Sequence, residues 1–317
     1  MRFPKRIFLT LSFGLIAGAL AYASPGALGS QDAKPEQSTP PATGQQGGTT
    51  QQAKPGQGGQ AAGQAPSAPT VTPEERQAYQ AVASEAAAGL DPDKVVSLSE
   101  DYIKKYANSP MLTSVYAFEA TAFRQKGELD KVVDASEKSL KLNGDNLVSL
   151  ITLALILPQP QLMQGNELDK QKKLTEAETD ANHALEIIAK IQKQPTETDD
   201  QFKKRQGELS SEPHAALGMI HLQRSTMVSL SGGMDPEELS KSAQEYQQAV
   251  TVTDRPQPED YFRLGEVYEN QNKIDDAIAA FSKASEIGQG SGIQPYADKQ
   301  IEILKKKQAE AKPPAKP

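Results

Sequence analysis

The chain has 317 residues, and its 34 lysines and arginines stand against 41 aspartates and glutamates, which gives a formal charge of −7. This acidic balance argues against nucleic-acid binding, because contact with phosphates requires a basic surface. There is no cysteine, which excludes disulfides, thiolate nucleophiles, thiolate metal sites and a lipid-modified cysteine at the amino terminus.

Residues 1–23 have the features of an export signal. A basic start is followed by an apolar run from Ile7, and Ala21 and Ala23 fit the small-x-small pattern of a cleavage site. We expect a signal peptide cleaved after Ala23; the alternative is an uncleaved membrane anchor over residues 7–23, because about 17 apolar residues is the lower limit for spanning a bilayer. In both cases the positive-inside bias predicts an exported protein, in the periplasm or cell envelope of a bacterium and, if anchored, tethered to the inner membrane.

Residues 24–71 are expected to form a disordered linker. They are rich in Gln, Gly and Pro, and from Ser30 onward they contain no Leu, Ile, Phe, Tyr or Met. Too little apolar surface is available to offset the entropy lost on ordering. For a coil of about 40 residues, square-root scaling gives an end-to-end distance of about 35 Å, which suits a tether between a membrane and a domain. Residues 309–317 are expected to form a similar disordered tail.

Residues 72–308 are predicted to be all-α. Thr72, Asp91 and Asp235 each stand directly before a proline, which pairs an N-capping residue with a residue favoured at the first helical position. Apolar residues recur at helical spacing between these starts, and we find no convincing strand-like alternation.

The clearest pattern lies in residues 258–291. One predicted helix carries an aromatic residue, a Leu-Gly pair and a tyrosine, and the next carries two alanines on either side of a phenylalanine. The seven positions are Tyr261, Leu264, Gly265, Tyr268, Ala277, Phe281 and Ala284. This spacing resembles the tetratricopeptide repeat, a hairpin of two helices. The resemblance implies that these seven residues pack the hairpin, the small ones by allowing close approach and the rings by filling the seam.

Weaker copies are expected upstream, because at least three stacked units are normally needed for stability. Residues 113–146 hold a second copy in register, with Tyr116, Ala120 and Phe123 in the slots of its first helix. A leading unit is expected to start with a helix over residues 74–88. The chain after Gly292 is expected to form a capping helix.

Two further units are expected to be interrupted. In the third, Leu153 and Ala154 occupy the Leu-Gly slots, but prolines follow and the second helix resumes late. In the fourth, Leu217 and Gly218 occupy these slots, and the partner helix with Tyr246 follows after about twelve additional residues. The sequence therefore predicts a tetratricopeptide-type helical-hairpin solenoid with irregular insertions.

The residues offer little for catalysis. His214 and His221 lie seven positions apart in aromatic packing slots, whereas a zinc helix needs i, i+4 spacing and a third ligand, so we expect them in the seam between helices. His183 is expected at the surface. The glycine-rich run at 288–292 follows a predicted helix and no strand, which indicates a helix-ending turn and not a phosphate loop. We predict no catalytic, cofactor-binding or metal-binding residue and no enzymatic activity.

The resemblance implies a non-enzymatic scaffold or adaptor, because tetratricopeptide arrays hold protein or peptide partners in a groove lined by the first helix of each repeat. The groove slots are occupied by Phe118, Arg124, Ile151, Leu155, Met219, Leu222, Phe262, Arg263, Glu266 and Asn270. The alternative for the apolar members is that the two insertions cover them. No run of Lys and Asn fills the slots, so a clamp for carboxylates is not predicted. The alternative function is a structural spacer or envelope-organising protein in which the linker matters and the groove does not.

Overall fold

The computed structural model describes residues 71–227 and 233–311. These residues form helices and no strand, which confirms the all-α prediction. The helices are α2 (Pro73–Ala88), α3 (Pro92–Lys105), α4 (Leu112–Lys126), α5 (Leu129–Leu142), α6 (Leu147–Ile156), α7 (Glu167–Lys190), α8 (Asp199–Met227), α9 (Pro236–Thr251), α10 (Pro258–Asn270), α11 (Ile274–Ile287) and α12 (Gln294–Ala311). The predicted export signal, the predicted linker up to residue 70 and the end of the tail lie outside the described residues.

The three helix starts predicted from an N-cap followed by proline are confirmed. The side chain of Thr72 accepts a hydrogen bond from the backbone N–H of Glu75 at 3.1 Å, and Asp91 accepts one from Lys94 at 3.0 Å. Asp235 accepts hydrogen bonds from the next two N–H groups after the proline, at 2.8 and 3.4 Å. Each cap satisfies backbone donors that the first turn of a helix leaves unpaired.

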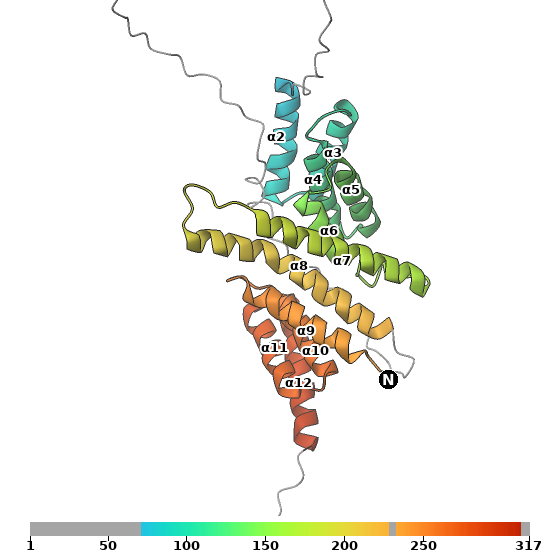
Figure 1. Ribbon diagram of the computed structural model, residues 1–317, viewed down its shortest axis with the longest axis vertical. Coiled ribbons are helices and arrows are strands. Elements are labelled where there is room, and N and C mark those ends of the chain that lie inside the picture. Colours follow the sequence, from blue (N-terminus) through green and yellow to red (C-terminus); the bar gives the residue numbers. More distant parts are fainter. Residues whose placement is uncertain (1–70, 228–232, 312–317) are drawn as a thin grey trace, which may run out of the picture.

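Consecutive helices pair into five antiparallel hairpins, α2/α3, α4/α5, α6/α7, α8/α9 and α10/α11, followed by α12 (Figure 1). The first helices of neighbouring hairpins also contact one another, in the order α2, α4, α6, α8 and α10, while the second helices make fewer contacts among themselves. The first helices therefore form a continuous layer. We call the side of the molecule that this layer lines the inner face.

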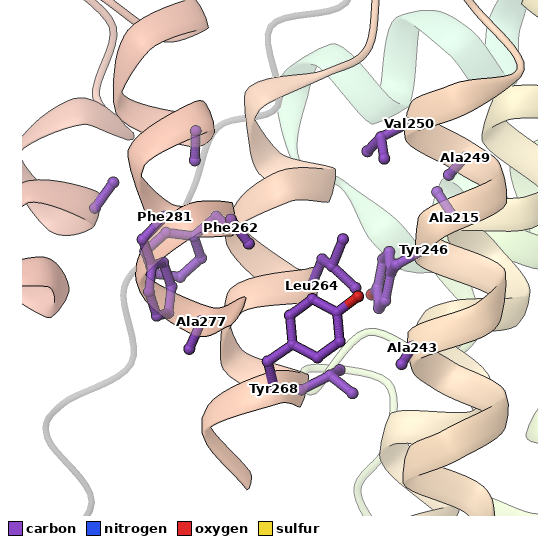
Figure 2. Packing of buried hydrophobic residues seen from close by; sticks show 14 of the residues in the cluster. Ala215, Ala243, Tyr246, Ala249, Val250, Phe262, Leu264, Tyr268, Ala277 and Phe281 are labelled. Atoms are coloured by element: carbon purple, nitrogen blue, oxygen red, sulfur yellow. The ribbon is translucent and has the colours of Figure 1, made fainter. Parts of the chain in front are cut away.

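The hairpin α10/α11 packs as the repeat pattern implies. A Cβ atom added at Gly265 would lie 2.8 Å from the ring of Phe281, so only glycine allows this approach. Ala277 and Ala284 are fully buried against α10, and Tyr268 is 9% exposed. Figure 2 shows Phe281 beside Phe262 and near Ala277 between the two helices, while the ring of Tyr268 lies toward Tyr246 of α9. Asn272 has a φ of 60°, which marks the tight turn between them.

The hairpin α8/α9 repeats this contact with different residues. The ring of Tyr246 lies against Gly218, where an added Cβ would come within 2.7 Å of it. Ser242 donates a hydrogen bond to the backbone carbonyl of Gly218 at 2.7 Å, and Ala249 is fully buried. The fourth unit therefore keeps the repeat geometry despite its longer connection.

The insertions lengthen α7 and α8, which lie side by side across the middle of the molecule (Figure 1). α8 begins at Asp199, well before the repeat slot at His214, and Pro213 lies inside the helix without ending it. The added amino-terminal part of α8 passes the end of α9 at close range, because a Cβ at Gly207 would lie 1.8 Å from the carbonyl oxygen of Val252.

The last helix, α12, covers the open side of α11, as the predicted cap requires. Its buried residues Ala297 and Leu304 join the core of the last two hairpins. The glycine-rich run before it forms a turn in which Gly290 has a φ of 77°, in agreement with the predicted helix-ending turn. In the part of the chain that the structure describes, no helix combines the length and apolar character needed to cross a membrane.

Candidate functional site

The apolar residues predicted for the groove divide into two groups. Met219 and Leu222 on α8 are partly buried beside the core of the last two hairpins, and Phe118 on α4 and Leu155 on α6 are partly buried against the cores of the amino-terminal half. These four retain some exposed surface.

Two predicted groove residues lie in the core instead. Ile151 is 2% exposed and packs between α6 and α7. Phe262 is 5% exposed, and its ring lies edge-on to that of Phe281, with the ring centroids 5.1 Å apart. Both side chains are taken up by packing within the array, so the structure corrects their placement on a partner-binding surface.

The polar candidates lie on or near the surface. Arg263 and Glu266 form an ion pair of 2.7 Å along α10, and both are partly exposed. Asn270, at the end of α10, is exposed, and Arg124, near the end of α4, is partly exposed.

Three of these four residues belong to a larger group of charges. Arg124 interacts electrostatically with Glu212 of α8, and Glu212 interacts in turn with Asp260 of α10. We define the inner charge cluster as Arg124, Glu212, Glu259, Asp260, Arg263 and Glu266. All six come from first helices of hairpins, and all six are partly exposed. The cluster therefore joins α4, α8 and α10 across the inner face.

Burial shapes the electrostatics of the cluster. Burial first, and then the carboxylates of Glu212 and Glu259, raise the pKa of Asp260 to about 8, while Arg263 opposes this shift. Burial also raises the pKa of Glu212, and Arg124 counteracts it. Glu266 is the main cause of the raised pKa of Arg263. The carboxylates outnumber the guanidinium groups, so the cluster has an excess of acid.

Glu212 and Asp260 were not among the residues predicted for the site. Acidic residues near the start of a helix are ordinarily explained by the helix dipole, as for Asp260 in the first turn of α10. The repeat register does contain a signal for this acidic group. Glu212 and Glu259 occupy equivalent positions, two residues before the first aromatic slot of their units, which is at His214 and Tyr261.

Two of the three histidines join neighbouring helices, and the third lies at the surface. His214 pairs with Glu245 at 2.7 Å and His221 pairs with Glu238 at 2.8 Å, so both join α8 to α9. His183 is 38% exposed and pairs with Asp145 at 2.9 Å. Among the described residues, no group of three or more His, Cys, Asp or Glu side chains is arranged to hold a metal ion.

Two hollows lie away from the inner charge cluster. One, of about 350 Å³, lies between the loop after α6 and the adjoining ends of α7 and α8, and it is lined by Pro160, Met163, Glu167, Lys170, Gln223, Thr226 and Met227. The other, of about 250 Å³, lies at the α3–α4 turn and is lined by Glu75, Lys105, Tyr106, Ala107, Asn108, Ser109 and Pro110. Neither contains a residue predicted for the site.

Comparisons with known proteins agree with this fold. Residues 261–287 match the family model of the tetratricopeptide repeat. A crystal structure of a thermophilic tetratricopeptide-repeat protein from Thermus thermophilus is 14% identical, with a TM-score of 0.50 and coverage of 72% of this chain and 98% of that chain. An assembly chaperone of RpL4 is 10% identical, with a TM-score of 0.52 and coverage of 74% of this chain and 86% of that chain. No curated protein sequence matches the chain significantly.

At these sequence identities the structural likeness establishes the fold alone. The family-model match locates one repeat of that fold, at residues 261–287. The chain therefore contains a tetratricopeptide repeat at residues 261–287, and the described residues have the fold of a tetratricopeptide-type helical solenoid. Its array departs from the regular repeat in the long helices α7 and α8.

Proposed function

We propose that the chain is an exported, non-enzymatic adaptor of the bacterial cell envelope that binds a protein or peptide partner across its inner face. The observation that carries this proposal is the inner charge cluster, which lies on the layer of first helices. The partly buried apolar residues Met219 and Leu222 belong to the same layer, on α8. Carboxyl and guanidinium groups held half-buried in this way are costly for the free protein, because their hydration is reduced. A partner that supplies hydrogen bonds and counter-charges would offset that cost.

Binding is tested with a random-peptide display library presented to the full-length wild-type chain. Affinities of the selected peptides are then measured by fluorescence anisotropy. The substitutions Met219→Ala and Leu222→Ala on the inner face should weaken binding by about tenfold, because each removes apolar contact area. The matched control is Leu168→Ala on α7, which is 64% exposed and lies outside the layer of first helices. Failure to select any peptide, or equal losses in the control, would overturn the proposal.

Export rests on the sequence of residues 1–23 and has its own test. Mass spectrometry of the protein recovered from a bacterial envelope fraction should show a mature amino terminus at residue 24 if the signal is cleaved. An intact terminus in the membrane fraction would establish the anchored alternative, and recovery from the cytoplasm would exclude export.

The linker provides a test against the spacer alternative. A chain lacking residues 30–71 should bind the selected peptides with unchanged affinity, because the proposed surface lies within the helical array. If a phenotype of the deletion appears in cells while substitutions on the inner face have no effect there, the spacer function is favoured.

A further inference from the structure

One hydroxyl group in the core of the carboxyl-terminal half has no evident structural role. Tyr246 is 1% exposed, and its hydroxyl oxygen is buried without a hydrogen-bond partner among the described residues. Its ring already fills the space against Gly218, for which a phenylalanine would serve as well. A buried polar group without a partner is destabilising, so this hydroxyl calls for an explanation.

The hydroxyl of Tyr246 is directed toward the inner charge cluster. The ring extends from α9 toward α10 (Figure 2), and the charges that act on the hydroxyl are Arg263, Asp260 and Glu266 of that helix. Glu212 approaches the same place from α8, and its Oε2 atom is also buried without a hydrogen-bond partner in the described part of the chain. Oxygen atoms of α8 and α9 therefore lie within electrostatic range of the carboxylate of Asp260 on α10.

The oxygen atoms at this location are suited to a cation. The carboxylates of Glu212 and Asp260 accept hydrogen bonds when ionised, and a bound cation favours this ionised form although burial raises the pKa of both groups. The phenolic oxygen of Tyr246 accepts as well. Arg124 acts on Glu212 and Arg263 acts on Asp260, but Arg263 is also paired with Glu266 at 2.7 Å, and the four carboxylates of the cluster outnumber its two guanidinium groups. An ammonium group has three donors and no acceptor, and a guanidinium group has five donors, so either complements this set of acceptors.

We propose that Glu212, Asp260 and the hydroxyl of Tyr246 form a subsite for a cationic side chain, lysine or arginine, of the bound peptide. This inference rests on the proposed adaptor function and specifies the chemistry of its partner. The competing explanation is an internal network closed by ordered water, in which the same three groups would serve the fold alone.

The test is a double-mutant cycle between the protein and peptides selected on the full-length chain. In each peptide, every lysine and arginine is replaced in turn by norleucine, and the lysines and arginines are also exchanged for one another. Affinities are measured for the wild type, Asp260→Asn and Glu212→Gln, and circular dichroism verifies that each variant is folded. The matched control is Glu186→Gln on α7, a carboxylate that is 67% exposed and paired with Lys190 at 3.7 Å.

One cationic position of the peptide should lose about tenfold or more in affinity for the wild type when it becomes norleucine. The same replacement should reduce affinity much less for Asp260→Asn and Glu212→Gln. For the control Glu186→Gln it should reduce affinity as much as for the wild type. If the affinity is unchanged when lysine and arginine are exchanged, the subsite recognises charge alone. If the affinity falls, the subsite also recognises the shape of the cationic group.

Tyr246→Phe gives a readout that a purely structural role would not produce. Removing an unpaired buried hydroxyl should raise the melting temperature of the free protein, while affinity for the cationic peptide should fall about threefold to tenfold. A variant with unchanged affinity would assign the hydroxyl to the fold.

The outcomes separate the two proposals. If no peptide is selected, the adaptor function fails and this inference fails with it. If peptides bind but no cationic position is coupled to Glu212 and Asp260, the subsite alone is wrong and the adaptor function stands.

Discussion

Glycine at two equivalent positions sets how closely the helices of a hairpin approach. At Gly265 and Gly218 an aromatic ring of the partner helix occupies the space that a Cβ would need. The rings, Phe281 and Tyr246, are almost completely buried, so they cannot move toward solvent to relieve a clash. At these positions glycine is required for packing and not for backbone conformation.

Gly265→Ala should therefore lower the free energy of unfolding by about 1–3 kcal/mol, because an additional methyl group must displace the ring of Phe281. Gly144→Ala is the control, since an added Cβ there would meet nothing within 4 Å. Urea denaturation of both variants measures the difference. Equal stabilities would show that the hairpin can open at no cost.

Asp180 on α7 should make stability depend on pH. It is half-buried, its Oδ2 atom lacks a hydrogen-bond partner in the described residues, and burial followed by Glu176 raises its pKa to about 7. Because this pKa lies above the unfolded value of about 3.9, the native state loses stability as the pH rises from about 4 through about 7.

Asp180→Asn should remove this loss. Because Asp180 is partly exposed, solvent screening reduces the effect. The free energy of unfolding of the variant should exceed that of the wild type by about 1–2 kcal/mol near pH 8, and the two values should converge below about pH 4. Thermal melts across this range provide the measurement, and Asp101→Asn, an exposed aspartate on α3, is the control. A gain that is the same at every pH would contradict the assignment.

At the scale of elements, α12 is needed because α11 would otherwise expose its apolar side. Leu304 is fully buried in this contact, while its neighbour Ile303 is 38% exposed. Leu304→Ala should lower the free energy of unfolding by about 2–5 kcal/mol, whereas Ile303→Ala should lower it by less than about 1 kcal/mol. Chemical denaturation distinguishes the two, and similar losses would mean that α12 does not cap the array as described.

The sequence predicts the hairpins well but not the lengths of all helices. Gly265 and Phe281 occupy slots that local spacing determines, so α10 and α11 can be recognised directly. The early start of α8 depends on contacts with distant residues, such as the Lys204–Asp254 ion pair of 3.0 Å and the approach of Gly207 to the end of α9. Such contacts leave no periodic pattern in the sequence.

The candidate site could be predicted only in part. Arg263 and Glu266 follow from the repeat register, because their slots face away from the hairpin seam. The same rule predicts a surface position for Phe262, yet its ring turns toward Phe281 and is buried. The role of Asp260 depends on Glu212 of α8, which only the stacking of hairpins brings near.

At the scale of the whole molecule, stability should be distributed along the array. Each hairpin contacts mainly its neighbours, and such arrays behave approximately as a sum of local and nearest-neighbour terms. In Leu304→Ala, amide hydrogen exchange should accelerate in α10, α11 and α12 and remain unchanged in α4 and α5. Uniform acceleration in all hairpins would indicate a single cooperative unit.

The long helices α7 and α8 also have a mechanical consequence. Helices α2 to α6 and helices α9 to α12 are joined mainly through this central pair. A small change in the angle between the two long helices therefore produces a larger displacement at the ends of the molecule. Arg124 belongs to one arm and Asp260 to the other. A ligand that contacts both residues would fix the distance between helices α2 to α6 and helices α9 to α12. It would thereby also fix the distance between the two ends of the array.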